Sequence, residues 1–238
     1  LPTMIALRWA RVLEACVTGA ASSMRMLLPH GIHWPEVLLM ASSECSVTGW
    51  SSLRPKAHGI ECATLEAMLA ESGIDPAALV VACFATPVGS AYGTEQRLSM
   101  VTDLSDYPQS LDRHLEAIRP HLCVSSVDQR LHVLNMLARA TPETLDRLAT
   151  ELGELAVASS KQVRVLAEPT LMRCGSAAST VLRELATKGK PEQRLHALRM
   201  VYRMGVERGV EADVAFARHA AANDKAASVQ ALVDEWSA

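Results

Sequence analysis

A ten-residue segment that occurs twice constrains the fold of this chain more than any other sequence feature. Residues 128–137 read DQRLHVLNML, and residues 192–201, sixty-four positions later, read EQRLHALRMV. Most positions of the two segments are identical or similar, and the chain has no low-complexity bias that would produce such a match. The match therefore indicates an internal structural repeat.

Two fainter copies of the same pattern indicate the length of the repeat. Residues 159–171 and 225–236 also have a polar start followed by small and large apolar residues on one stripe. Successive spacings of 34, 30 and 36 residues separate four equivalent positions, Gln129, Val163, Gln193 and Val229. A period in the thirties is typical of one helical pair per unit, which buries its apolar face only against neighbouring units. We therefore predict an all-α fold, in which residues 125–238 form a right-handed α-solenoid of stacked antiparallel helix pairs.

The composition agrees with a helical protein that has little attraction for nucleic acid. Of the 238 residues, 49% are hydrophobic, mainly Ala and Leu rather than the β-branched residues that favour sheets. The formal net charge is −3, so a broad basic surface that neutralises phosphates is not expected. The longest apolar run, residues 77–85, is shorter than the roughly 20 residues of a membrane span. Because the sequence opens on Leu1 and Pro2 rather than Met, we expect a piece of a longer chain.

The six cysteines favour a reducing compartment. No two of them form a CxxC pair, and they are scattered over the chain at Cys16, Cys45, Cys62, Cys83, Cys123 and Cys174. Such scattering is typical of reduced core thiols in a cytoplasmic protein. Five residues of the N-terminal half are conceivable zinc ligands, namely His30, His33, Cys45, His58 and Cys62. Their spacing matches no structural zinc pattern, so we predict neither a metal nor another cofactor.

The N-terminal half, residues 1–124, is predicted to be an irregular helical part of one continuous domain. Two long loops, residues 42–59 and 86–94, interrupt its helical periodicity with Ser, Gly and Pro. Long loops in compact domains are more often functional than incidental, which makes Trp50 in the first loop a candidate binding residue.

Start and stop signals place several helices in this half. Gly73 is expected to end one helix, and Asp75 followed by Pro76 to begin the next, which is apolar on nearly all sides and should be buried. Pro108 is expected to break the chain before a short amphipathic helix. The expected helices cover residues 3–18, 35–40, 60–72, 76–84, 95–104 and 110–119.

Capping residues and a leucine stripe place helices in the repeated half. Helix starts are predicted at Ser125 with Asp128, at Thr141 with Pro142, and at Ser159 or Ser160. A clean amphipathic stripe, with steps of three and four residues, consists of Leu145, Leu148, Leu152 and Leu155. The next helix should bury Val163, Ala167, Thr170, Leu171 and Cys174. Pro169 lies inside it and should produce a kink, because it cannot donate to the Val165 carbonyl.

The repeated half resembles HEAT repeats, most strongly over residues 152–175, LGELAVASSKQVRVLAEPTLMRCG. A leucine-rich first helix, a polar turn and a second helix that opens with Val163 and Arg164 carry the resemblance. It implies a HEAT/armadillo-like fold, in which the Arg of each second helix pairs with an acidic turn residue of a neighbouring repeat. The matching positions hold Arg130, Arg164 and Arg194. The turn at Ser159 and Ser160 has no acidic residue, so the pairing should fail at that step.

Residues 104–175 are also similar to the repeat-bearing region of the large bacterial proteins typified by the molybdate metabolism regulator. The similarity is carried by residues 104–122, LSDYPQSLDRHLEAIRPHL, and by residues 155–168, LAVASSKQVRVLAE. This resemblance implies a scaffold region of a multidomain cytosolic protein.

The sequence contains no arrangement typical of catalysis. Residues 88–93, VGSAYG, lack the G-x-S-x-G spacing of a nucleophile elbow, and the glycine motifs that bind phosphates are absent. Carboxylate pairs such as Asp103/Asp106 and Glu151/Glu154 are expected on solvated helix faces or at helix ends. We therefore predict that the chain is not an enzyme.

Two features are candidates for binding. His132 and His196 share one repeat position, so they either line a groove in a row or bond individually to solvent and neighbouring turns. Basic residues cluster in the second half and are interleaved with Glu184 and Glu192; the cluster includes Lys161, Arg164 and Arg194. This cluster is either a charge-mixed solvated face or a strip that binds an anion or an acidic partner.

These observations favour a non-catalytic α-solenoid scaffold that binds a protein partner in the cytoplasm. The alternative is a nucleic-acid-binding regulator or a HEAT-like DNA glycosylase. The acidic balance and the dispersed tryptophans argue against that alternative. The candidate binding residues are Lys161, Arg164, His132, His196, Arg194 and Trp50.

Overall fold

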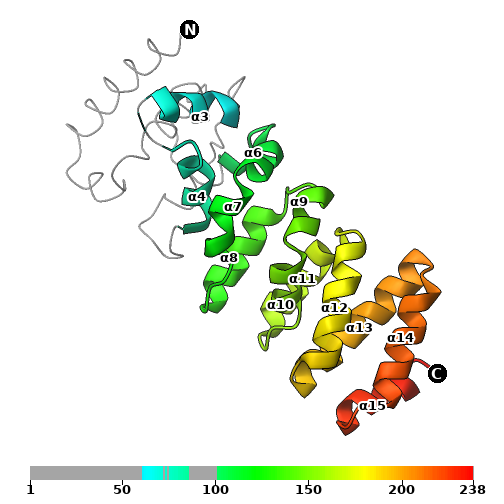
Figure 1. Cartoon of the computed structure of the whole chain (residues 1–238). Helices are drawn as coiled ribbons and strands as arrows, with labels where there is room; N and C mark the ends of the chain where they lie inside the picture. Colours follow the sequence, from blue (N-terminus) through cyan, green and yellow to red (C-terminus); the bar gives the residue numbers. More distant parts are fainter. Residues whose placement is uncertain (1–60, 72, 74, 86–100, 238) are drawn as a thin grey trace, which may run out of the picture. The chain divides into compact units, whose positions relative to one another are not determined.

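The computed structural model describes residues 61–71, 73, 75–85 and 101–237, and every regular element in these ranges is a helix (Figure 1). The all-α prediction is therefore confirmed for this part of the chain. By its internal contacts the chain divides into two compact units, residues 1–121 and 122–238. The predicted helix at residues 3–18, the two predicted loops and Trp50 lie outside the described residues.

The described part of the first unit is a cluster of short helices around α4. Because its sequence, ALVVACFA, has no polar side chain, α4 is buried on most sides, as predicted. Helix α4 contacts α3, α7 and η2, and α3 also contacts α6. The elements are α3 (Cys62–Glu71), α4 (Ala78–Ala85), α6 (Tyr107–Arg113), α7 (Leu115–Ile118) and the 3-10 helix η2 (Arg119–His121).

The predicted boundary between α3 and α4 is confirmed. Gly73 has a φ of 73°, in the left-handed region that glycine tolerates, and its N–H donates to the Ala70 carbonyl at 3.0 Å. The Asp75 carboxylate accepts a hydrogen bond of 2.9 Å from the Ala77 N–H at the start of α4.

The predicted helix over residues 110–119 is wrong in its bounds. Pro108 does not break the chain, because it lies in the first turn of α6, where a missing N–H leaves no helical hydrogen bond unmade. The break comes instead at His114, whose φ of −111° and ψ of 22° separate α6 from α7. The predicted inward face is nevertheless buried, with Leu111, Leu115 and Ile118 each at most 1% exposed.

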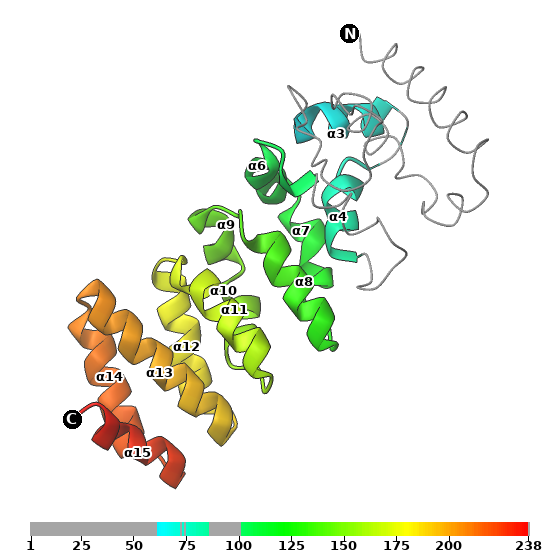
Figure 2. The same cartoon turned by 180° about the vertical axis from the view of Figure 1, so that it is seen from behind.

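The second unit consists of helices that contact their chain neighbours (Figures 1 and 2). Helices α10 and α11, α12 and α13, and α14 and α15 form packed pairs, while α10 also contacts α12 and α12 also contacts α14. In addition, α8 packs beside α11 and α13 beside α15. The elements are α8 (Val127–Leu137), α9 (Pro142–Arg147), α10 (Ala149–Ala156), α11 (Lys161–Met172), α12 (Ser176–Lys188), α13 (Pro191–Arg208), α14 (Glu211–Ala222) and α15 (Ala227–Glu235).

The leucine stripe is buried as predicted, although it does not lie on one helix. The exposed fractions are 0%, 0%, 0% and 7% for Leu145, Leu148, Leu152 and Leu155. Leu148, with a φ of −105° and a ψ of 12°, separates α9 from α10. The Leu148 side chain would be buried in a continuous helix and is also buried in this interrupted one. Apolar periodicity therefore predicts which side chains face the core, but it does not predict the break in the backbone at Leu148.

Capping signals were correct at one helix start and displaced at another. The Thr141 hydroxyl accepts from the Thr144 N–H at 3.2 Å, as predicted for the start of α9. Helix α8 is capped by Ser126 and not by Ser125, so that prediction is wrong by one residue. Ser160 holds the N-cap position of α11, but its hydroxyl accepts no capping hydrogen bond.

Helix α11 continues from Lys161 to Met172 with Pro169 inside it. Its predicted inward face is confirmed, because the five residues named for it, Val163, Ala167, Thr170, Leu171 and Cys174, are all buried. The predicted kink at Pro169 stays a prediction.

The arginine in the first turn of each long second helix folds back onto the turn that precedes it. The carbonyl acceptors lie 2.6–2.9 Å away and belong to Val124, Ala158, Ser159 and Gly189. Their donors are Arg130, Arg164 and Arg194. Each guanidinium therefore fixes the turn that enters its own helix.

A second arginine row joins the far ends of successive helices. Arg173 donates at 2.6 Å to the Ala138 carbonyl, beyond the end of α8, and also to the Ala140 carbonyl. Arg208, thirty-five residues later, donates to the carbonyls of Met172, Cys174 and Gly175 at 2.6–3.0 Å. These bonds satisfy carbonyls that a helix end leaves without an internal partner.

Candidate binding groove

A groove of about 430 Å³ lies between α11 and α13, with the end of α15 beside it. These helices are labelled in Figure 2. The residues that line each wall recur at helical spacing. Lys161, Arg164, Val165 and Glu168 recur every three or four residues along α11. On α13 the same spacing brings His196, Arg199, Met200 and Arg203 to one face.

The groove offers apolar surface beside its charges. Val165 is 61% exposed and lines this depression between the helices. Met200 is only 4% exposed and contributes to the packed base of the same groove. An apolar side chain of a ligand could therefore cover Val165 and remove it from water.

Positive charge predominates along the groove. Four cationic side chains, Lys161, Arg164, Arg199 and Arg203, face two carboxylates, those of Glu168 and Glu235, which corresponds to a net charge of +2 with His196 neutral. Arg199 pairs with Glu235 at 2.7 Å, and Arg203 lies 3.6 Å from Glu168.

For two of these cations the described residues supply no carboxylate partner. In this part of the chain Arg164 donates to the Ala158 and Ser159 carbonyls, in both cases through Nη1. Lys161 is exposed, and among the described residues no carboxylate forms an ion pair with it. The excess positive charge therefore lies at the start of α11.

His196 has an environment that keeps it neutral. Burial of the imidazole lowers the pKa of His196 below its ordinary value, and the charge of Arg164 lowers it further. Arg199 acts in the same direction and Glu192 opposes it. Near neutral pH the groove therefore presents an uncharged imidazole between its cations.

Aromatic side chains close one end of the groove. The rings of Tyr202 and Trp236 stack with their centroids 4.3 Å apart and their planes 3° from parallel. The Arg218 guanidinium carbon lies 5.7 Å from the Tyr202 centroid. Tyr202 and Trp236 are 34 residues apart, which is one repeat length. This spacing was the only sequence signal that could have revealed the pair.

The structure brings three of the six predicted binding residues together. Lys161, Arg164 and His196 line the groove. Arg194 instead donates from Nε and Nη2 to the Asp224 carboxylate at 2.7 Å each, which joins α13 to the turn before α15. His132 lies half-buried on α8 and does not line this groove. Sequence reasoning missed the exposed Val165 and the stacked aromatic pair.

The expected arginine–carboxylate pairing occurs at Arg194. Asp224 follows Arg194 by thirty residues and lies in the turn of the next helix pair, as the resemblance to HEAT repeats implies. At Arg130 the corresponding turn holds Ser159 and Ser160, and the hydrogen bond recorded for this arginine goes to a carbonyl of its own turn.

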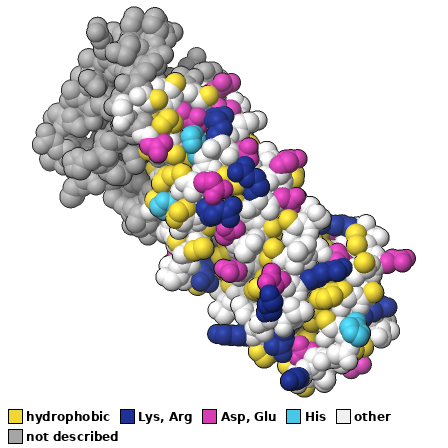
Figure 3. Space-filling model, in the orientation of Figure 1, with side chains coloured by type: hydrophobic (Ala, Val, Ile, Leu, Met, Phe, Trp, Pro, Cys, Tyr) yellow, Lys and Arg dark blue, Asp and Glu magenta, His cyan; other side chains and the backbone are white. Residues whose placement is uncertain are grey.

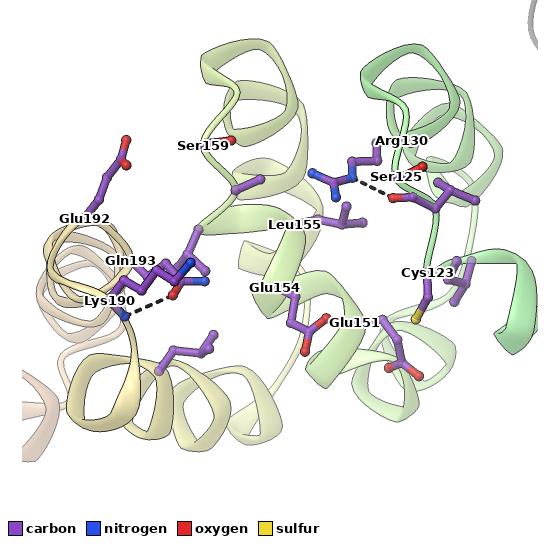
Figure 4. A pocket seen from close by; sticks show the side chains of 15 residues that line it. Cys123, Ser125, Arg130, Glu151, Glu154, Leu155, Ser159, Lys190, Glu192 and Gln193 are labelled. Atoms are coloured by element: carbon purple, nitrogen blue, oxygen red, sulfur yellow. Dashed lines mark hydrogen bonds between the residues drawn. The ribbon is translucent and has the colours of Figure 1, made fainter.

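A larger pocket, of about 720 Å³, is lined by residues that precede α8, by the end of α10 and by the start of α13 (Figure 4). Its charges are mixed, with Arg130 and Lys190 facing Glu151, Glu154 and Glu192. Figure 4 shows Glu192 and Arg130 on opposite sides of the pocket. This pocket therefore has volume but no set of polar groups that converge on one point.

The first unit contains a buried polar cluster that joins α3 to α6. Glu66, 7% exposed, accepts hydrogen bonds from the Ser110 hydroxyl and, at 2.8 and 3.1 Å, from Arg113. The Asp106 carboxylate accepts the backbone N–H groups of Cys62 and Ala63 at 2.6 and 2.9 Å and so caps α3. The Ser110 side chain is fully buried, so a substrate could not reach its hydroxyl in this structure.

The buried thiols of Cys62 and Cys174 are poor nucleophiles, Cys123 is exposed, and the described residues offer no metal site. Burial, followed by the charge of Asp106, raises the pKa of the Cys62 thiol, and burial raises the pKa of Cys174 to about 12. No group of three or more His, Cys, Asp or Glu in the described ranges could hold a metal ion. Of the conceivable zinc ligands, Cys62 is described; His30, His33, Cys45 and His58 lie outside.

No helix in the ranges that the structure covers is long and apolar enough to cross a membrane. Comparisons of the chain with protein-family models, with curated proteins and with solved structures found no match.

Proposed function

We propose that the second unit is a right-handed, HEAT/armadillo-like α-solenoid, and that it is a non-catalytic scaffold for a protein partner in a larger cytosolic protein. The observation that carries the proposal is the groove between α11 and α13. It combines an exposed aliphatic side chain, Val165, with two cations, Lys161 and Arg164, to which the described residues supply no carboxylate partner. Interaction surfaces of proteins combine apolar anchors and charged rims in this way.

Repeated contacts support the solenoid part of the proposal. Arg173 and Arg208 make equivalent bonds to the preceding helix end at an interval of one repeat. First helices contact first helices, as α10 contacts α12, and a second helix contacts a second helix where α13 meets α15. Stacked repeats contact mainly their nearest neighbours and create extended grooves between equivalent helices.

A peptide-display selection tests whether the groove binds protein segments. The 238-residue chain is immobilised and short random peptides are selected for binding. Recovered peptides are then measured against the double variant Lys161→Glu and Val165→Glu. The expected result is a loss of at least about tenfold in affinity, because the variant reverses one charge and places another on the apolar contact.

The chain offers two control substitutions of the same chemical kind. Lys225→Glu changes an exposed lysine two residues before the start of α15, and Val206→Glu changes a valine that is 57% exposed on α13. Both control residues lie away from the groove lining. Peptides that bind the groove variant as tightly as the wild type would overturn the proposal, and so would a selection that recovers no binding peptide.

The nucleic-acid alternative makes a different prediction. Lys, Arg, Asp and Glu side chains are interspersed over the face of the second unit seen in Figure 3, and no broad basic patch is visible on that face. A mobility-shift measurement with short duplex DNA is expected to show no micromolar binding at about 150 mM salt. Binding of that strength would favour a DNA-acting protein instead.

A further inference from the structure

We propose that the groove between α11 and α13 recognises an acidic segment, in which carboxylate side chains flank one apolar side chain. This inference rests on the proposed function and specifies the chemistry of the partner. It follows from the groups that line the groove, where Lys161 and Arg164 precede the exposed Val165 on α11, and further cations belong to α13.

The side chains of Arg164 and Lys161 on α11 are positioned to bind carboxylates. The hydrogen bonds to the Ala158 and Ser159 carbonyls, at 2.6 and 2.8 Å, hold Arg164 in place through Nη1. They leave its Nη2 and Nε groups outside those bonds. A guanidinium fixed in this way loses little side-chain entropy when a carboxylate binds. Lys161 adds a second charge one helical turn away.

The opposite wall has less charge to offer a ligand. Arg199 is paired with Glu235 at 2.7 Å, and Arg203 with Glu207 at 2.9 Å. A ligand carboxylate near α13 therefore has to share a cation with a protein carboxylate. We accordingly place the principal acidic contact at Lys161 and Arg164.

The apolar contact is Val165, because it follows Arg164 directly and is 61% exposed. A leucine or phenylalanine of the partner that covers it would gain the free energy of apolar burial, while neighbouring acidic side chains reach the cations. An inorganic anion would use only the charges and leave Val165 in water.

A protein segment fits this groove better than a nucleic acid does. The Tyr202 ring already stacks on Trp236 and has the Arg218 guanidinium 5.7 Å from its centroid, so a base would have to compete with these contacts. The carboxylates of Glu168 and Glu235 also interrupt the cationic walls. A continuous phosphate backbone would meet these negative charges, whereas a peptide can present acidic residues at selected positions only.

Fluorescence anisotropy with three synthetic peptides and the whole chain tests the inference. The first peptide combines Asp and Glu with one central Leu. The second replaces the acidic residues with Lys, and the third replaces Leu with Ser. The first is expected to bind, the second not to bind detectably, and the third to bind at least about tenfold more weakly.

Two variants locate the binding site. Lys161→Glu is expected to weaken binding of the acidic peptide at least about tenfold, and Lys225→Glu to leave it unchanged. A glutamate at the start of α11 is compatible with the helix dipole, so the variant should fold. Binding of the first peptide should also weaken as salt is raised.

The outcomes separate this inference from the proposed function. Equal binding of the acidic and the lysine peptide would overturn the inference, and so would an affinity unaffected by Lys161→Glu. Groove-dependent peptides without acidic residues, recovered in the display selection, would overturn the inference and leave the scaffold function standing. Tighter, groove-dependent binding of a single-stranded oligonucleotide would overturn both.

Discussion

At the level of single residues, arginine guanidinium groups join the turns of successive helix pairs. Arg194 forms two hydrogen bonds of 2.7 Å to Asp224, and the two side chains are 18% and 8% exposed. The same carboxylate accepts the Ala226 N–H at 2.8 Å, near the start of α15. One aspartate therefore fixes both the neighbouring helix and the start of the helix that follows it.

Asp224→Asn is expected to lower the free energy of unfolding by about 2 kcal/mol near neutral pH, because Arg194 would lose an ionised partner. The hydrogen bonds from Arg194 hold the pKa of Asp224 below its ordinary value. Stability from this group is therefore complete above the ordinary aspartate pKa of about 3.9 and is lost as pH falls towards the lower folded-state pKa. Urea unfolding of both proteins should show a difference that shrinks below about pH 4.

The control for this prediction is Glu184→Gln. Glu184 pairs with Lys188 at 2.6 Å, but the side chains are 60% and 75% exposed, so solvent screens the pair. The variant should unfold at nearly the same urea concentration as the wild type. A difference between wild type and Asp224→Asn that stays constant from neutral to acidic pH would contradict the assignment.

At the level of elements, close helix packing depends on small residues at contact points. Gly153 on α10 lies against α12, where an added Cβ would lie 2.6 Å from Val181 Cγ1 and 3.3 Å from Leu185 Cδ1. Valine is stiff in a helix, so its methyl group cannot turn aside cheaply. The glycine thus allows the two helices to approach, even though alanine is the better helix former.

Gly153→Ala is expected to destabilise the protein by about 1–2 kcal/mol, because overpacking outweighs the gain in helix propensity. Combining it with Val181→Ala removes the clash and should reduce the cost of the glycine substitution by about 1 kcal/mol. Thermal or urea unfolding of the four proteins of this cycle measures the coupling. If the free-energy changes of the two single substitutions added up to that of the double variant, α10 and α12 would not be in contact at this point.

At the level of the whole molecule, the proposed solenoid predicts stability that varies along the second unit. In such an array each helix pair is stabilised mainly by its nearest neighbours, so the last pair can open while the others stay folded. Leu232 in α15 and Leu182 in α12 are 1% and 0% exposed and offer matched sites at the end and in the middle of the array.

Leu232→Ala is expected to lower the free energy of unfolding by about 2–3 kcal/mol, mainly because α14 and α15 open locally. Hydrogen exchange should accelerate in those helices and stay slow in α10 and α11. Leu182→Ala should accelerate exchange in helices on both sides of α12. Uniform acceleration in both variants would indicate one cooperative bundle and would contradict the solenoid proposal.

Several features of this protein could be predicted from local sequence because their causes are local. The inward stripe from Leu145 to Leu155 was predicted by periodicity, and the start of α9 by the pairing of Thr141 with Pro142. The break at Leu148 could not be predicted, since a buried leucine fits both a continuous and an interrupted helix. The spacing of apolar residues reflects which side chains are buried, and the same side chains can be buried by more than one backbone conformation.

The sequence by itself determined the helical class of the described part and the basic start of α11 with Lys161 and Arg164. These follow from the spacing of apolar and charged residues along one chain segment. Only the tertiary structure decided that Val165 stays exposed, that Arg194 pairs with Asp224, and that Tyr202 meets Trp236 one repeat later. Such contacts depend on the distance and rotation between successive helix pairs, which side-chain packing sets across the repeat interface and no local pattern encodes.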